Sequence, residues 1–179
     1  MKRILIVVDM QNDFVTGSLG SPFAQSIVPA VDARLKEAHD AGDMVIFTRD
    51  THDADYLGTQ EGKNLPVEHC IKKSRGWEII DQLKPHVNII GDTFDKESFG
   101  SIDLAAYIKR RLGGEPVEEI ELAGLCTDIC VISNALILKA AFPETLITVN
   151  AVCCAGVTKE SHDLALKAMK ACQVNIIGE

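Results

Sequence analysis

The sequence predicts an α/β fold of the three-layer αβα type, in which an open, mostly parallel sheet of six strands lies between two layers of helices. Short and almost wholly apolar runs, such as residues 4–8, are typical of parallel strands that are buried on both faces. Between these runs apolar residues recur at helical spacing, as Ile27, Val31 and Leu35 do. No linker, repeat or low-complexity tract divides the chain, so we expect one domain spanning 1–179.

Strands and helices are expected to alternate along the chain, with right-handed crossovers. The predicted strands are residues 3–8, 44–48, 86–90, 117–123, 145–149 and 174–177. The predicted helices are residues 27–41, 77–83, 104–112, 128–141 and 165–172. Glycines follow two of these helices, at Gly42 and Gly113, where glycine readily ends a helix. Residues 50–76 and 91–101 are expected to be loops, and structureless loops of such length are usually functional.

Composition excludes several classes of function. The net charge is -8 with a pI near 5.1 and no basic stripe, which disfavours binding to nucleic acid or to anionic lipid. No apolar run is long enough to span a membrane, and Asp9 cuts the first run too short for a signal peptide. We therefore expect a cytoplasmic protein.

The cysteine pattern predicts free thiols. Six cysteines without two Cys-x-x-Cys pairs favour neither a disulfide framework nor a zinc ribbon. Cys153, Cys154 and Cys172 lie in apolar contexts, so we expect these thiols to be small buried hydrophobes.

Reactive side chains follow the ends of the predicted strands. They are Asp9 after the first strand, Asp50 and His52 after the second, Lys96 after the third, and Cys126 and Cys130 after the fourth. In an open α/β sheet, ligands bind beyond the carboxyl ends of the strands, near the switch in strand order. We therefore expect one edge of the sheet to hold the functional site.

Cys130 is the favoured nucleophile at this edge. Thr127 is a good N-cap residue for the following helix, which places Cys130 in the first turn, where the helix dipole favours a thiolate. Lys96 is expected to lower the pKa of the thiol and to keep Asp9 ionised as the base. Taken singly, Asp9 could cap a turn, Lys96 could be a solvated charge and Cys130 an inert core thiol.

Three segments resemble the isochorismatase-like cysteine hydrolases, and most closely their nicotinamidase branch. They are Asp9-Met10-Gln11-Asn12-Asp13-Phe14, the lysine loop at 92–99, and residues 124–131. The resemblance covers essentially the whole chain and implies a Rossmann-like fold with a catalytic set of Asp9, Lys96 and Cys130. It also implies a homo-oligomer, because relatives commonly form dimers or tetramers.

The resemblance implies further features of the turn after the fourth strand. A cis peptide bond between Leu125 and Cys126 would direct the N–H groups of Cys126 and Cys130 into an oxyanion hole. Cys126 stands where the family usually has a small residue, so its thiol is not expected to be the nucleophile.

A metal site is also implied by the resemblance. Asp50, His52 and His69 match the family's ligands, and Glu61 resembles an additional acidic ligand of some members. Imidazoles with carboxylates suit a divalent ion, Zn²⁺ above all, with Mn²⁺ or Fe²⁺ as alternatives. The other histidines, His39, His86 and His162, are expected to be incidental.

The expected reaction is hydrolysis of nicotinamide, or a similar small aromatic carboxamide, to the acid and ammonia through a thioester on Cys130. Such a reaction would serve NAD salvage. Phe14 is the expected aromatic wall for the ring, and Leu19 and Tyr56 are weaker candidates for substrate binding.

Other functions remain open at this point. The nearest alternative is an amidase for a carbamoyl or maleamate-type substrate. An isochorismatase is disfavoured, because hydrolysis of a vinyl ether needs no cysteine. Outside enzymes, the chain could be a metal-binding domain or a redox sensor that uses Cys126 and Cys130. A dinucleotide-binding domain is disfavoured, because no Gly-x-Gly-x-x-Gly follows the first strand.

Overall fold

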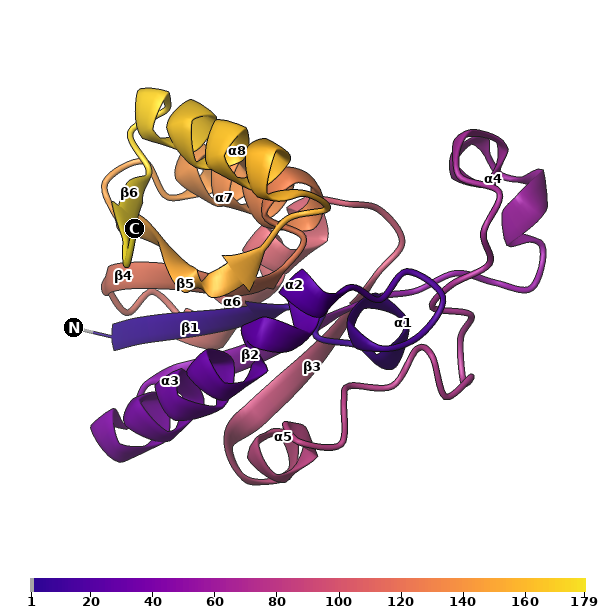
Figure 1. The fold of residues 1–179 in the computed structure, drawn as a ribbon. Coiled ribbons are helices and arrows are strands. Elements are labelled where there is room, and N and C mark those ends of the chain that lie inside the picture. Colours follow the sequence, from indigo (N-terminus) through magenta and orange to yellow (C-terminus); the bar gives the residue numbers. More distant parts are fainter. Residues whose placement is uncertain (1) are drawn as a thin grey trace.

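The computed structural model describes residues 2–179, apart from the side chains at 88 and 90. Within this range six strands form one sheet, in the order β3-β2-β1-β4-β5-β6, and every neighbouring pair is parallel (Figure 1). The strands are β1 (Lys2–Val8), β2 (Met44–Asp50), β3 (Gly91–Lys96), β4 (Val117–Leu125), β5 (Leu146–Ala155) and β6 (Asn175–Ile177). The predicted α/β fold with a parallel sheet is confirmed.

Helices cover both faces of this sheet. They are α1 (Asn12–Val15), α2 (Pro22–Ser26), α3 (Val28–Ala41), α4 (Gln60–Asn64), α5 (Lys84–Ile90), α6 (Ile102–Leu112), α7 (Ile132–Ala141) and α8 (Lys159–Ala171). A 3₁₀ turn, η1 (Tyr56–Gly58), and a π-turn, η2 (Thr127–Val131), complete the elements. Helices α6, α7 and α8 pack on one face, while α2 and α3 pack on the other. Among residues 2–179, no helix has both the length and the apolar character needed to cross a membrane.

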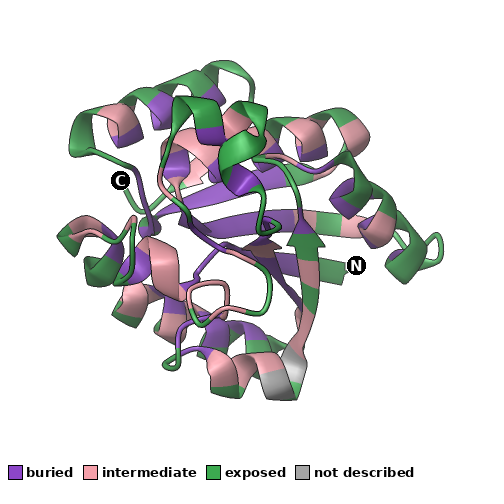
Figure 2. Ribbon diagram, turned by 90° about the vertical axis from the view of Figure 1, so that its right-hand side faces the viewer, coloured by how far each residue is buried: buried purple, intermediate pink, exposed green. Residues whose placement is uncertain are grey.

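The central strand β1 shows why the sheet is buried on both faces. Ile4, Ile6 and Val8 belong to the apolar core beneath α6–α8, whereas Leu5 and Val7 belong to the core beneath α3. Each of these side chains is at most 2% exposed, and burial of one such side chain stabilises the fold by about 1.5–3 kcal/mol. The buried strands between two layers of helices are visible in Figure 2.

The third strand lies further along the chain than the sequence suggests. Residues 86–90, predicted as a strand, belong to helix α5, and residues 77–83, predicted as a helix, form turns before it. Pro85 lies in the first turn of α5, where its missing N–H needs no partner. The strand β3 begins at Gly91, where an added Cβ would be 2.6 Å from the ring of Phe47. As a result Lys96 ends a strand and does not lie in a loop.

Two further expectations about loops and thiols need correction. The segment 50–76 is not structureless, because it contains η1 and α4. All six cysteines are free, and Cys153 and Cys154 are buried as predicted. Cys172 is exposed, because it caps the C-terminal end of α8 and no longer lies on that helix's buried stripe.

Gly124 allows β4 to pass close to β1 just before the functional edge. Its φ is +114°, and an added Cβ would lie 2.1 Å from the carbonyl oxygen of Val8, its register partner. A glycine is therefore required at this position for both conformational and steric reasons.

We predict that Gly124→Ala destabilises the protein by more than about 4 kcal/mol, because the backbone of β1 cannot move away from the new methyl group. Gly42→Ala is the matched control, since Gly42 also has a positive φ of +72° but has no atom within 4 Å of an added Cβ. The control should cost about 1–2 kcal/mol. Urea unfolding measures both values, and equal losses would show that the contact with Val8 is unimportant.

Candidate active site

The candidate site lies at the carboxyl edge of the sheet, where the strand order reverses between β1 and β4. Asp9 follows β1, Asp50 ends β2, Lys96 ends β3 and Cys126 follows β4. The strand ends deliver these side chains to one place, as the sequence predicts, although they are far apart along the chain.

Lys96 lies between Asp9 and Cys130. Its Nζ is 2.7 Å from Oδ2 of Asp9 and 3.5 Å from Sγ of Cys130. Asp9 and Lys96 have side chains with 0% exposure, and Cys130 is 4% exposed. An acid–base group, a cation and a thiol are thus held in contact, away from bulk water.

Burial decides the protonation of this group. Burial raises the pKa of Asp9, and Lys96 only partly opposes that rise. Burial and then the charge of Asp9 raise the pKa of Cys130 well above its usual value, against the lowering effect of Lys96. Lys96 does lower the pKa of the thiol, as expected, but burial and Asp9 outweigh it, so the net bias toward a thiolate that the helix start suggested is not found. Beside the thiol, Asp9 and Lys96 form a buried ion pair.

The turn that carries Cys130 has the implied cis peptide bond between Leu125 and Cys126. After it the chain forms the π-turn η2, in which the carbonyl oxygen of Cys126 accepts from the N–H groups of Ile129 and Val131. The N–H groups of Cys126 and Cys130 therefore belong to one short and tightly folded segment that begins at the end of β4.

The prediction that Thr127 caps this helix is wrong. The cap position is Cys126, without a side-chain hydrogen bond, and the Thr127 hydroxyl is 2.8 Å from Nδ1 of His162 on α8. His162 is buried and not incidental, and burial lowers its pKa, which favours the neutral imidazole. Asp128 of the same turn accepts from the N–H of Val157 at 3.1 Å. The turn is thus anchored by the segment leading into α8.

Asn134, which the sequence analysis missed, connects the turn with the loop after Lys96. Its side chain is fully buried and donates to the carbonyl oxygens of Cys130 at 2.8 Å and Phe99 at 3.0 Å. Its Oδ1 accepts from the N–H of Ser101 at 3.0 Å. A polar residue within the mostly apolar helix α7 is the signal that could have identified it.

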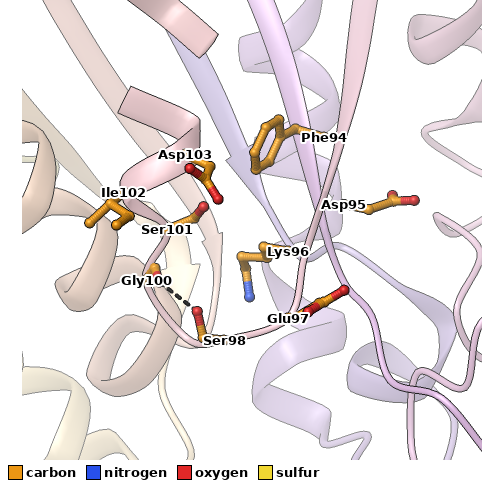
Figure 3. A pocket seen from close by; sticks show the side chains of 9 residues that line it. All are labelled: Phe94, Asp95, Lys96, Glu97, Ser98, Gly100, Ser101, Ile102 and Asp103. Atoms are coloured by element: carbon orange, nitrogen blue, oxygen red, sulfur yellow. Dashed lines mark hydrogen bonds between the residues drawn. The ribbon is translucent and has the colours of Figure 1, made fainter. Parts of the chain in front are cut away.

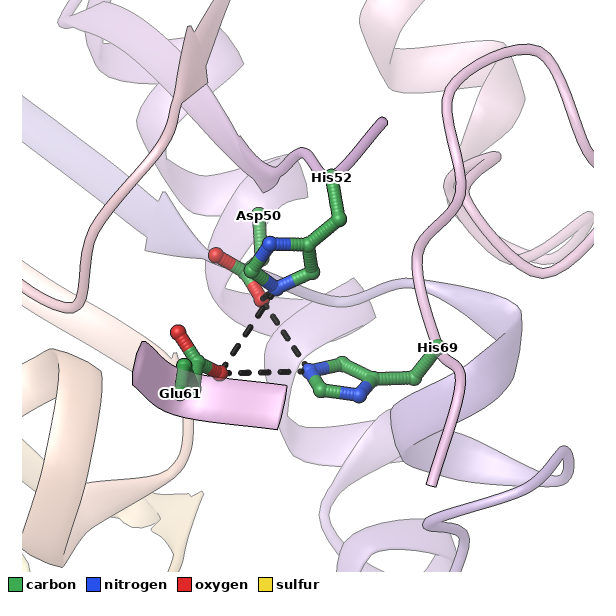
Figure 4. Close-up of side chains that lie close together, drawn as sticks. All are labelled: Asp50, His52, Glu61 and His69. Atoms are coloured by element: carbon green, nitrogen blue, oxygen red, sulfur yellow. Dashed lines mark hydrogen bonds and ion pairs between the residues drawn. The ribbon is translucent and has the colours of Figure 1, made fainter. Parts of the chain in front are cut away.

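A second cluster of side chains adjoins the lysine. Asp50, His52, Glu61 and His69 each point one ligand atom toward the others, and these atoms all lie within 4.8 Å of one another (Figure 4). Nε2 of His52 is 3.0 Å from Oδ2 of Asp50, and Nε2 of His69 is 3.6 Å from Oε1 of Glu61. Two imidazole nitrogens with two carboxylates form a donor set that fits a zinc-like ion.

Hydrogen bonds around this cluster fix its orientation. Nδ1 of His69 is 2.8 Å from the carbonyl oxygen of Val67, so the proton is held there and Nε2 faces the cluster. Burial would raise the pKa of Asp50, but the hydrogen bonds from His52 and His69 and the charge of Lys96 hold it well below the usual range. Asp50 is therefore a carboxylate that is ready to accept a cation.

Asp50 also joins the two clusters. Its Oδ1 is 3.4 Å from Nζ of Lys96, while its Oδ2 faces the two histidines. One carboxylate thus contacts both the lysine and the candidate metal ligands, which makes these two parts a single electrostatic unit.

Gln11 supports this unit and was not identified from the sequence. Its side chain is fully buried, donates to the carbonyl oxygen of Asp50 at 2.8 Å and accepts from the N–H of Asp50 at 2.7 Å. Its own N–H donates to the carbonyl oxygen of Asp9 at 2.7 Å. A buried amide directly after the first strand is the signal that could have indicated this role.

The three candidate substrate-binding residues differ in position. The Phe14 ring is partly exposed, with its centroid 5.5 Å from that of His69. Tyr56 is fully buried with its ring 4.6 Å from that of His52, and its hydroxyl donates to Leu65, so it supports the histidines from behind. Leu19 is partly exposed in the loop after α1. Roles in substrate binding stay predictions for all three.

A cavity of about 530 Å³ opens beside the end of β3, next to Lys96 (Figure 3). It is lined by Phe94, Asp95, Lys96, Glu97, Ser98, Gly100, Ser101, Ile102 and Asp103. The loop after Lys96 therefore borders open space, while the Nζ of the lysine points toward the buried cluster.

Comparison with known proteins identifies the family. The model of the isochorismatase domain matches residues 3–178. The chain belongs to the isochorismatase family. It is 31% identical, over 93% of both chains, to an uncharacterised isochorismatase family protein, PncA, of Bacillus subtilis.

Solved structures of the family have the same fold. The nicotinamidase/pyrazinamidase PncA of Bacillus subtilis is 28% identical with a TM-score of 0.85, covering 99% of this chain and 100% of that one. The pyrazinamidase of Pyrococcus horikoshii, solved in complex with zinc, is 26% identical with a TM-score of 0.79, and the match covers 100% of both chains.

We predict that Lys96→Met destabilises the protein by about 3–5 kcal/mol at neutral pH, because the buried carboxylates of Asp9 and Asp50 lose their cation. Lys96 lowers the pKa of Asp9, so the pKa of folded Asp9 rises further in the variant. A carboxyl with a raised pKa in the folded state costs stability as the pH rises above its unfolded value, near 3.9. The deficit, measured by urea unfolding, should therefore shrink toward about pH 4. A deficit independent of pH would contradict this electrostatic origin.

Proposed function

We propose that this chain hydrolyses nicotinamide, or a similar small aromatic carboxamide, to the carboxylic acid and ammonia. Membership of the family, with nicotinamidase relatives, makes it an amidohydrolase that acts on a C–N bond. The observation that carries the proposal is the buried contact of Asp9, Lys96 and Cys130 beside a cluster suited to a metal ion.

The first half of the reaction forms a thioester. Asp9 accepts the proton of the Cys130 thiol, and the sulfur forms a bond with the carbonyl carbon of the amide. The electron pair of the C=O π bond moves to oxygen, where the N–H groups of Cys126 and Cys130 receive the negative charge. Donors aimed at such an oxyanion are each worth roughly 3 kcal/mol in the transition state. Lys96 remains protonated and stabilises the negative charge, whether it is on Asp9 or on the Cys130 sulfur.

Asp9 then returns the proton. Protonated Asp9 gives its proton to the amide nitrogen, the C–N bond breaks as the oxyanion again becomes a carbonyl, and ammonia leaves. Asp9, again ionised, accepts a proton from water as the water oxygen attacks the thioester. The second tetrahedral intermediate expels the Cys130 sulfur, which regains a proton, and the acid is released. Because burial raises the pKa of the Cys130 thiol, the nucleophile is generated together with proton transfer to Asp9.

A divalent ion, zinc above all, is proposed to bind at the cluster formed by Asp50, His52, Glu61 and His69. The zinc-bound pyrazinamidase of the family supports this choice of metal. Such an ion would supply a Lewis-acidic position that binds the ring nitrogen of the substrate or orders a water molecule. Phe14, whose ring lies beside His69, is proposed as the wall against which the substrate ring packs.

We predict that Cys130→Ala lowers kcat for ammonia release from nicotinamide by about 10³-fold or more, because no thioester can form. Cys126→Ala should keep most activity, since the proposed role of Cys126 uses only its backbone N–H. A coupled ammonia assay measures both variants. Loss of activity in Cys126→Ala, with Cys130→Ala active, would overturn the assignment of the nucleophile. Turnover of carbamoyl or maleamate-type amides but not nicotinamide would overturn the proposed substrate.

We predict that His69→Ala lowers the zinc content of the purified protein and lowers kcat/KM for nicotinamide, because a ligand nitrogen is lost from the cluster. His86→Ala is the matched control, since His86 contacts Asp32, which is not a member of the cluster. Elemental analysis and the ammonia assay, before and after dialysis against a chelator, measure both effects. Equal zinc content in the two variants would contradict the proposed site.

A further inference from the structure

Thr48 is a buried polar residue in strand β2, and its hydroxyl both donates to and accepts from Asp9. The hydroxyl donates to Oδ1 of Asp9 at 2.6 Å and accepts from the backbone N–H of Asp9 at 3.2 Å. The same N–H is also 3.2 Å from the carbonyl oxygen of Thr48. Both residues have 0% exposure, so the hydroxyl contacts the carboxylate without competition from solvent.

The backbone of Asp9 depends on such contacts. Its φ is +49°, a left-handed conformation that costs a non-glycine residue of order 1–3 kcal/mol. A residue stays in this conformation only where its surroundings hold it there. Thr48 holds both the N–H and the carboxylate of Asp9, and thereby fixes how the side chain leaves the end of β1.

The two carboxylate oxygens of Asp9 are therefore not equivalent. Oδ1 is occupied by the Thr48 hydroxyl. Oδ2 is 2.7 Å from Nζ of Lys96, yet it accepts no well-aligned hydrogen bond from any residue that the structure describes. An acceptor lone pair on Oδ2 is thus available on the side where Lys96 also contacts the Cys130 sulfur.

We propose that Thr48 is a positioning residue that makes Oδ2 the one oxygen of Asp9 that takes the proton of Cys130 and returns it to the leaving nitrogen. Thr48 holds Oδ1 on the side of β2, whereas Oδ2 lies beside the Lys96 ammonium, which also contacts the Cys130 sulfur. This inference rests on the proposed function, because the proton shuttle is a step of that reaction.

Loss of the Thr48 hydroxyl is expected to raise the pKa of Asp9. The hydrogen bond from Thr48 stabilises the ionised form of Asp9, so its removal raises the pKa of that carboxyl. The other charged or titratable groups around Asp9 are all left unchanged by this substitution. They are Lys96 from β3, Asp50 from β2, Cys126 and Cys130 from the turn after β4, and Cys70 from the segment before α5. The acidic limb of the pH–rate profile should then move to higher pH.

The test is Thr48→Val, which keeps the shape of the side chain and removes the hydroxyl. We expect kcat for nicotinamide to fall about 10- to 100-fold with KM nearly unchanged, the effect of one hydrogen bond to a charged group. Thr48→Ser keeps the hydroxyl and should restore most of the loss. Thr48→Ala also lacks the hydroxyl and should show the same loss of kcat, so the test does not depend on the folding of the valine variant alone.

Thr148 on β5 offers a closely matched control. It is also fully buried, and its hydroxyl donates to a carboxylate oxygen of Glu119 at the same distance, 2.6 Å. Thr148→Val should cost similar stability but keep the wild-type kcat and pH profile. Equal losses of kcat in the two valine variants, or an unshifted acidic limb in Thr48→Val, would overturn the proposal.

A second readout separates this proposal from the proposed function. The rate at which iodoacetamide alkylates Cys130, followed against pH by mass analysis, reports the coupling of the thiol to Asp9 without any amide substrate. Its onset should move to higher pH in Thr48→Val, and an unchanged onset would overturn the role of Thr48. Failure of the wild-type protein to release ammonia from any amide would overturn the proposed function while leaving this onset measurable.

Discussion

The buried ammonium of Lys96 is the interaction on which the rest of the functional edge depends. It contacts Asp9, Asp50 and Cys130, each of which would be costly to ionise in an apolar interior without it. One cation among these three groups permits only a limited negative charge. The pKa of the thiol is therefore raised, whereas the additional contacts with the histidines lower the pKa of Asp50. Lys96 is thus shared among groups that compete for its positive charge.

Backbone topology brings these groups together, and buried polar side chains then hold them in place. The parallel order of β3, β2, β1 and β4 places successive strand ends side by side. Gln11 ties the segment after β1 to the end of β2, and Asn134 ties the turn of Cys130 to the loop after β3. His162 holds the same turn from α8. Each side chain links parts of the chain that are distant in sequence.

Local patterns and long-range contacts explain which features the sequence could predict. Strand β1 is strongly apolar over residues 4–8, and the motifs near Asp9 and Cys130 indicated the candidate residues. The third strand was misplaced, because residues 86–90 hold only three apolar residues, too short a pattern to distinguish strand from helix. The cap at Thr127 was wrong because its partner, His162, is 35 positions away. The raised pKa of Cys130 does not follow from the sequence, because burial, which no local motif encodes, outweighs Lys96.

The side chain of Gln11 makes hydrogen bonds that a neighbouring strand would otherwise make. By pairing with both the N–H and the carbonyl oxygen of Asp50, it does for the end of β2 what a neighbouring backbone would do. The segments bearing Asp9 and Asp50 are consequently joined by hydrogen bonds at the ends of their strands. Asp50 in turn contacts Lys96, whose ammonium also contacts Asp9. The amide of Gln11 and the ammonium of Lys96 therefore bridge the same two strand ends, one through the backbone and the other through the carboxylates.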